Sequence, residues 1–110
     1  MANTFKNSAL ADVATGSYTD LYTTPSATQV VILGLALANK NSAAVTVDVQ
    51  FYDASATTGY QLLSTVSIPG FTTLETLAGQ KYILEAGDKL KVKAGTSSSI
   101  DVVLGLMEKT

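Results

Sequence analysis

The stretch Val45-Thr46-Val47-Asp48-Val49-Gln50-Phe51-Tyr52 alternates apolar and polar side chains over its first seven positions. A period of two is typical of a β-strand, because successive side chains point to opposite faces of a sheet. Residues 45–52 therefore predict a strand whose odd-numbered side chains are buried. The same alternation recurs in residues 89–94, where Lys89, Lys91 and Lys93 alternate with apolar residues.

Clusters of turn-forming residues separate the apolar segments at short intervals. They occupy residues 15–17, 24–26, 39–42, 53–59, 69–70, 78–80, 86–88 and 95–99. Such regular spacing indicates many short strands, and no long window keeps apolar residues at helical spacing. We therefore expect an all-β fold: an antiparallel β-sandwich, or jelly-roll-like domain, of about eight short strands.

The length of 110 residues fits one domain. We expect residues 1–110 to form a single β-sandwich, with residues 1–14 as an N-terminal arm or an edge strand. No signal peptide is recognisable in these first residues. The longest apolar stretch, residues 30–38, is much shorter than the roughly 20 residues of a membrane-spanning helix. We therefore expect no membrane association.

The composition argues against several functions. The chain has neither histidine nor cysteine, which removes zinc sites and the usual Ser-His and Cys-His nucleophiles. The net charge is -2 and every basic residue is lysine, which argues against nucleic acid as a partner. The glycines form no phosphate-binding motif. We expect no catalytic residue, no metal site, no cofactor and no enzymatic activity.

Carboxylate pairs are the remaining source of acid-base chemistry. The nearest pairs in sequence are Asp48 with Asp53 and Glu85 with Asp88. Aspartate is common on the polar faces of strands and in turns, where it bonds to the backbone. The loop of residues 53–59 offers only one carboxylate for calcium. We interpret these carboxylates as structural.

Two segments, residues 30–38 and 100–107, are apolar on both predicted faces. A sandwich leaves the outer side of each sheet in water, so outward apolar residues suggest that another subunit covers them. The candidate oligomer interface is the smaller face of each segment: Val30, Ile32, Gly34, Ala36, Ala38, Val103, Gly105 and Met107. The alternative is a central strand that tolerates a few outward alanines and valines.

Two further groups are candidate partner contacts. Lys89, Lys91 and Lys93 lie on one predicted strand face, where they would meet an acidic surface or protect a sheet edge from unwanted pairing. Tyr18 and Tyr22 flank Asp20 at period two. Two rings on one face could stack on a sugar, and the alternative is that they pack against loops or partners.

The chain resembles a family of small virion structural proteins of tailed bacteriophages, especially phages of marine and cyanobacterial hosts. The resemblance spans nearly the full length. It rests on Met1-Ala2-Asn3-Thr4-Phe5-Lys6-Asn7, Leu21-Tyr22-Thr23-Thr24-Pro25, Gly34-Leu35-Ala36-Leu37-Ala38-Asn39, Val45-Thr46-Val47-Asp48-Val49, Ile68-Pro69-Gly70, Leu84-Glu85-Ala86-Gly87-Asp88-Lys89-Leu90-Lys91-Val92 and Met107-Glu108-Lys109-Thr110.

The resemblance implies a non-enzymatic virion protein that is made in the host cytoplasm and self-associates, with a trimer on the capsid exterior favoured. In this hypothesis it is a capsid decoration or cement protein that binds the major capsid protein or other virion proteins. The alternatives are a tail, neck or fibre component, and a module on the virion that binds a glycan or receptor.

Overall fold

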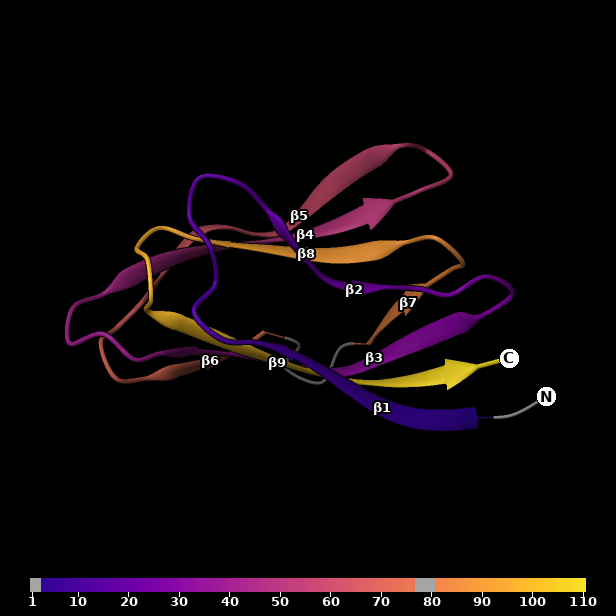
Figure 1. Cartoon of the computed structure of the whole chain (residues 1–110), viewed down its shortest axis with the longest axis horizontal. Coiled ribbons are helices and arrows are strands. Elements are labelled where there is room, and N and C mark those ends of the chain that lie inside the picture. Colours follow the sequence, from indigo (N-terminus) through magenta and orange to yellow (C-terminus); the bar gives the residue numbers. More distant parts are fainter. Residues whose placement is uncertain (1–2, 77–80) are drawn as a thin grey trace.

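The computed structural model describes residues 3–76 and 81–110, which form nine β-strands and no helix (Figure 1). The strands are β1 (Asn3–Leu10), β2 (Thr19–Thr23), β3 (Gln29–Asn39), β4 (Val45–Asp53), β5 (Thr58–Ile68), β6 (Thr73–Glu75), β7 (Tyr82–Leu84), β8 (Lys89–Ala94) and β9 (Ile100–Lys109). The all-β prediction is confirmed. The turn predicted at residues 78–80 lies outside the described residues.

The strands form two antiparallel sheets that lie over one another as two layers (Figure 1). Sheet 1 has the order β1-β9-β3-β6, and β7 pairs with β3 further along the same strand; sheet 2 has the order β2-β8-β4-β5. The chain crosses from one sheet to the other six times, in the connections β1–β2, β2–β3, β3–β4, β5–β6, β7–β8 and β8–β9. This strand order is that of a jelly roll in which β6 and β7 share one strand position.

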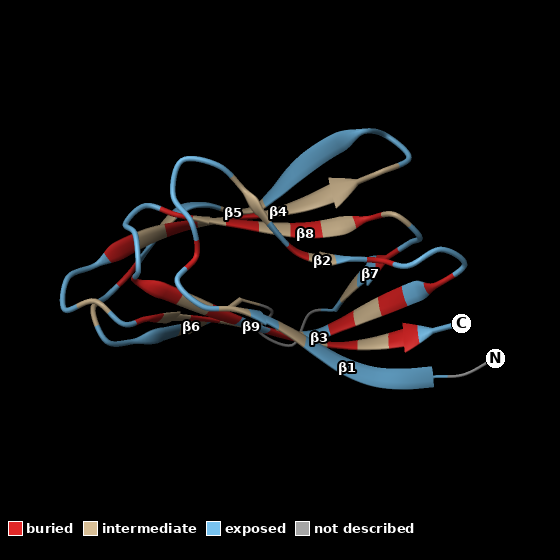
Figure 2. Cartoon of the chain, viewed as in Figure 1, coloured by how far each residue is buried: buried red, intermediate tan, exposed pale blue. Residues whose placement is uncertain are grey.

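The hydrophobic core lies between the two sheets, where the buried segments of Figure 2 face one another. Sheet 1 contributes Val30, Ile32, Leu35, Leu37, Leu84, Ile100, Val102, Leu104 and Leu106. Sheet 2 contributes Leu21, Val45, Val47, Val49, Ile68, Leu90, Val92 and Ala94. The alternation in β4, β8 and β9 therefore identifies the core-facing residues correctly, because each of these strands buries one face.

The strand β3 corrects part of the predicted interface. Val30 and Ile32 are fully buried, whereas we expected them on the outer face. The reason is a β-bulge: Ile32 pairs with Leu106 and Gly34 with Gly105, so Leu33 is an extra residue on β3. An extra residue reverses the faces of a strand. Even-numbered side chains point inward before Leu33 and outward after it.

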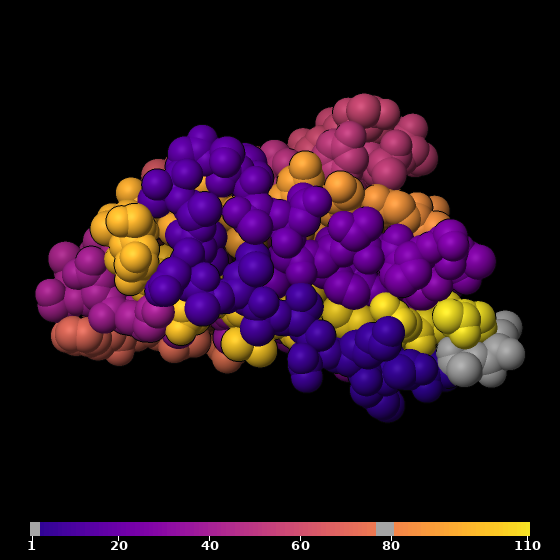
Figure 3. All heavy atoms as spheres, in the orientation of Figure 1, coloured from indigo at the N-terminus to yellow at the C-terminus, as the bar shows by residue number. Residues whose placement is uncertain are grey.

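Residues 3–10 of the predicted arm form an edge strand, β1, which pairs with β9 over its whole length. Most of β1 is exposed. Its atoms lie along the lower border of the molecule in Figure 3, beside those of the C-terminal strand. The outer face of sheet 1 therefore begins at β1 and continues over β9 and β3 to β6 and β7.

Candidate functional site

The outer face of sheet 1 carries the main candidate site, and the strand register arranges its side chains in three rows across the sheet. The large row consists of Phe5, Met107, Val31 and Ile83. The glycine row consists of Asn7, Gly105 and Gly34. The small row consists of Ala9, Val103 and Ala36, and Glu75 on β6 follows them at the margin of the face. Of the predicted interface, this face brings together Gly34, Ala36, Ala38, Val103, Gly105 and Met107.

This face holds most of the large hydrophobic side chains that are exposed in the described residues. Residues 3–76 and 81–110 expose six such side chains, and four of them lie on this face: Phe5, Leu33, Ile83 and Val103. Phe5 is 74% exposed and Val103 is 54% exposed. A contiguous apolar patch on a soluble domain marks an interaction site more often than scattered single residues do.

Gly34 and Gly105 form a cross-strand pair in the middle of this face. Neither has a left-handed φ, and a Cβ atom added to either would meet no heavy atom within 4 Å. Neither conformation nor crowding within the chain therefore requires glycine. Glycine in a strand destabilises the fold by about 0.5–1 kcal/mol relative to alanine, and it often marks a place where another backbone or a ligand approaches closely.

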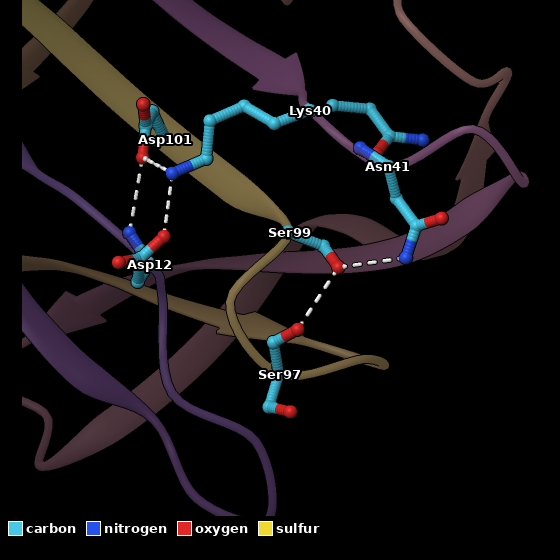
Figure 4. A network of polar contacts seen from close by, with 7 residues as sticks. Asp12, Lys40, Asn41, Ser97, Ser99 and Asp101 are labelled. Atoms are coloured by element: carbon cyan, nitrogen blue, oxygen red, sulfur yellow. Dashed lines mark hydrogen bonds and ion pairs between the residues drawn. The ribbon is translucent and has the colours of Figure 1, made fainter.

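A polar cluster closes one end of this face (Figure 4). The Nζ atom of Lys40 lies 3.0 Å from Oδ1 of Asp101 and also binds Asp12, whose backbone N–H donates to Asp101 at 3.0 Å. The hydrogen bond from the Asp12 N–H makes the largest contribution to lowering the pKa of the Asp101 carboxyl, and the hydrogen bond from Lys40 makes the next largest. Hydrogen bonds to Asp12 and Asp101 raise the pKa of Lys40. The cluster ties two loops to the beginning of β9.

Asn41 and Ser99 extend this polar region on the other side of Lys40 (Figure 4). The Nδ2 atom of Asn41 donates to Oγ of Ser99 at 3.2 Å, and Ser99 donates to the backbone carbonyl of Ser97 at 2.9 Å. Ser99 is buried. These bonds hold the loop before β9 in place.

The outer face of sheet 2 is charged instead. Lys89 and Lys91 lie 3.1 and 3.8 Å from the carboxylate of Asp20, and Lys93 lies 3.8 Å from Asp48. Lys91 also lies 4.6 Å from the ring centre of Tyr52. The three lysines do share one face, as predicted. The interpretation as edge protection is wrong, because β8 lies between β2 and β4 and has no free edge.

Tyr18 and Tyr22 do not share a face. Asp20 pairs with Lys91 and Tyr22 with Leu90, so Leu21 is a bulge residue that turns Tyr22 toward the core. Tyr18 stays outside, where its hydroxyl donates to Gln61 at 3.0 Å and its ring lies 4.9 Å from Nζ of Lys93. The paired platform for a sugar is therefore not formed.

Tyr22 belongs to a partly buried polar network that the sequence interpretation missed. Its hydroxyl donates to Glu108, which also forms an ion pair of 3.0 Å with Lys6 on β1. Burial and the Glu108 carboxylate raise the pKa of Tyr22, whereas the Tyr22 hydroxyl and Lys6 lower that of Glu108. Glu108 continues the inward series of β9, so the alternation could have identified it as a buried carboxylate. The network joins β1, β2 and β9.

The carboxylates considered for catalysis bind turns and loops of the backbone. Asp53 accepts hydrogen bonds from Ser55 and Ala56, which lower its pKa. Asp88 accepts the N–H groups of Ala54 and Glu85, each at 3.0 Å. Asp48 accepts the backbone N–H of Thr65. Residues 3–76 and 81–110 contain no group of three carboxylates that could hold a metal ion.

Two other features of the described chain have less bearing on function. A shallow open depression beside the end of β9 is lined by Ala27, Thr28, Gln29, Glu85, Ala86, Lys109 and Thr110. Residues 3–76 and 81–110 contain no helix that is long and apolar enough to cross a membrane.

Comparison with known proteins supports the fold. No protein-family model matches this chain, and no curated protein matches it in sequence. Among solved structures, a chain from the work "Bacillus endospore appendages form a novel family of disulfide-linked pili" is similar with a TM-score of 0.53 and 11% identity. The match covers 96% of this chain and 85% of the other. At this identity the similarity shows a shared all-β architecture.

Proposed function

We propose that this chain is a non-enzymatic structural subunit that self-associates through the outer face of sheet 1. The observation that carries the proposal is the pair Gly34 and Gly105, which lies among exposed apolar side chains. Neither the backbone conformation nor crowding within the chain requires glycine at these two positions. A face of this kind gains stability when a second protein surface covers it. The role needs packing and no reaction chemistry.

Within this class, the virion resemblance supports a capsid decoration or cement protein on the capsid exterior. Such a subunit binds the assembled shell, through the major capsid protein or other virion proteins, and stabilises it by mass action. The proposed location is the virion, after synthesis in the host cytoplasm. The charged outer face of sheet 2 remains available for this second contact, because the apolar face serves self-association.

A second candidate is a subunit of an appendage, tail or fibre. The observation that favours it is the architecture shared with the Bacillus appendage chain. That appendage is described as disulfide-linked, whereas this chain has no cysteine. An assembly of this chain would therefore rest on noncovalent contacts. A glycan-binding role loses its proposed site, because Tyr18 and Tyr22 lie on different faces.

Light scattering on a sizing column tests self-association. We expect a mass above that of the 11.4 kDa chain, rising with concentration, and the mass distinguishes a dimer from the trimer that the resemblance favours. A monomer at all concentrations up to the millimolar range would contradict the proposal. Electron microscopy of the assembled protein, alone and mixed with empty phage shells, then separates filaments from shell decoration.

A further inference from the structure

We infer that the outer face of sheet 1 pairs with the same face of a second copy about a two-fold axis that crosses the strands over the glycine row. This inference rests on the proposed self-association and specifies its geometry. The axis lies in the plane between the facing sheets 1 of the two copies and is perpendicular to the strands. The strands of the two copies therefore run in opposite directions. Residues at equal distances on either side of Gly105 along β9 then face each other.

The three rows make the face complementary to itself in size. Under this symmetry the large row of one copy lies over the small row of the other. Phe5 faces the partner's Ala9, and Val31 faces the partner's Ala36. Alternating large and small residues across two sheets gives the interlocking that close packing needs.

The glycine row lies on the axis and faces itself. Gly34 and Gly105 leave open space above the sheet, and the bulge places Leu33 beside this space with 43% of its surface exposed. In the pair, Leu33 of each copy covers the glycines of the other. This contact explains the two glycines, which no contact within a single chain explains.

The charges on the face agree with the same axis. Asp101 precedes Gly105 by four residues and Lys109 follows it by four, so each carboxylate faces the partner's ammonium group. Asp101 also binds Lys40, which binds Asp12, so this cluster has two carboxylates and one ammonium group and keeps a net charge of -1 that attracts the partner's Lys109. The side chain of Asp101 is 37% exposed, and Lys109 is exposed. Two symmetric ion pairs therefore form at the ends of the interface and set the register.

A face-to-face arrangement about an axis along the strands is unfavourable. An axis parallel to β9 would place Asp101 against the partner's Asp101 and Lys109 against the partner's Lys109. It would also place Phe5 against the partner's Val31, which are both large. Like charges in contact oppose association, so the register of the face favours the axis across the strands over the axis along them.

The area is sufficient for a specific dimer. The ten residues of β9 span about 33 Å, and four strand positions span about 19 Å, at the usual strand rise and spacing. The product is about 600 Å² per copy, or about 1,200 Å² for the pair, which exceeds the roughly 1,000 Å² of a specific interface.

Zero-length chemical cross-linking tests the register directly. A carbodiimide joins a carboxylate to an amine in contact, and eight residues of a strand separate Asp101 from Lys109 by about 26 Å within one chain. A bond between these two side chains therefore forms only between copies. With a mixture of light and isotope-labelled protein, we expect mass spectrometry to find an Asp101–Lys109 peptide with one light and one heavy half. Lys109→Gln removes it.

A matched pair of lysine substitutions tests the same face without chemistry. Val103→Lys places a charge in the small row, and Ser67→Lys places one on the exposed edge strand of sheet 2. We expect Val103→Lys to raise the dimer dissociation constant by at least 100-fold with an unchanged circular dichroism spectrum. Ser67→Lys should leave the dissociation constant within about two-fold.

The outcomes separate this inference from the proposed function. If the wild-type protein is assembled, but the mixed Asp101–Lys109 peptide is absent and Val103→Lys remains assembled, the two-fold geometry is overturned and self-association stands. If the wild-type protein is a monomer throughout, both are overturned. If Val103→Lys unfolds, Ala36→Lys on the same row takes its place, and the cross-link result is independent of both.

Discussion

The two outer faces of this sandwich differ although the two inner faces are alike. Sheet 1 presents glycine, alanine, valine and exposed Phe5 to its surroundings, whereas sheet 2 presents Lys89, Lys91 and Lys93 with their acidic partners. Both sheets bury an apolar inner face. The fold therefore requires an apolar inner face of each sheet. The two outer faces differ because they contact different surroundings.

Sheet 2 serves as the internal reference for sheet 1. An antiparallel sheet with one solvated face normally carries polar side chains there, and sheet 2 follows this rule. The central strands of sheet 1 do not, because Ala36, Val103 and Met107 lie outward with the glycine pair between them. The departure is confined to one face, which is the pattern of an interface and not of a generally apolar protein.

The largest expected effect comes from comparing substitutions at two neighbouring residues of β9, one on the inner face of sheet 1 and one on its outer face. Leu104 is fully buried and Val103 is 54% exposed. Leu104→Ala removes core packing and should lower the free energy of unfolding by about 2–5 kcal/mol. Val103→Ala should change it by less than about 0.5 kcal/mol in dilute monomer. Urea unfolding followed by circular dichroism measures both, and comparable losses would mean that Val103 is part of the core.

The next effect concerns the edge of the apolar face. Glu108→Gln replaces the carboxylate that holds Tyr22 and Lys6. Loss of a hydrogen-bonded, mostly buried charge should cost about 1–3 kcal/mol. We expect faster hydrogen exchange at the amides of β1 in this variant than in the wild type. Unchanged exchange would show that the ladder to β9 alone holds β1.

This network and the Lys40 cluster at the other end of β9 predict how stability depends on pH. The folded pKa values of Glu108 and Asp101 are lowered, so their contribution is complete above their unfolded values of about 4 and is lost as pH falls further. The pKa of Tyr22 is raised, so its contribution is complete below about pH 10 and is lost above it. Thermal melting should show a plateau from about pH 5 to pH 10, and Tyr22→Phe should reduce the alkaline loss.

A smaller effect is expected at the glycine row, where one substitution should stabilise the monomer and weaken the dimer. Gly105→Val introduces a residue that favours strands at a position with free space and an ordinary φ. The monomer should gain about 0.5–1 kcal/mol, while the dimer should weaken because the new side chain occupies the place of the partner's Leu33. Urea unfolding of the dilute protein and sedimentation at high concentration measure the two effects. A destabilised monomer would mean that the fold itself needs this glycine.

Much of the fold could be predicted from the sequence because alternation is a local property. The strands β4, β8 and β9 and their buried residues follow directly from period two. The bulges at Leu33 and Leu21 could not be predicted this way. Each inserts one residue, leaves the composition unchanged and reverses every side chain beyond it, which displaced Val30, Ile32 and Tyr22 from their expected faces.

The neighbours of a strand are also not a local property. The lysines of β8 were compatible with a sheet edge, and only the pairing of β8 with both β2 and β4 shows that the strand is central. The rows of the sheet 1 outer face depend in the same way on the register between β1, β9 and β3. The sequence indicated which residues were outward on β9, while their alignment required the structure.

The smallest expected effect tests whether sheet 2 is the solvated face that the comparison assumes. Lys91→Gln removes a charge 3.8 Å from Asp20 and above the ring of Tyr52. Asp20 keeps Lys89 as its partner at 3.1 Å, so loss of the longer, exposed Lys91 ion pair should cost little. An exposed cation–π contact contributes about 0.5–1 kcal/mol, so the free energy of unfolding should fall by less than about 1 kcal/mol. The difference should shrink in high salt, with no change in oligomer mass. If Lys91→Gln dissociates the protein as Val103→Lys is expected to, sheet 2 contributes an interface as well.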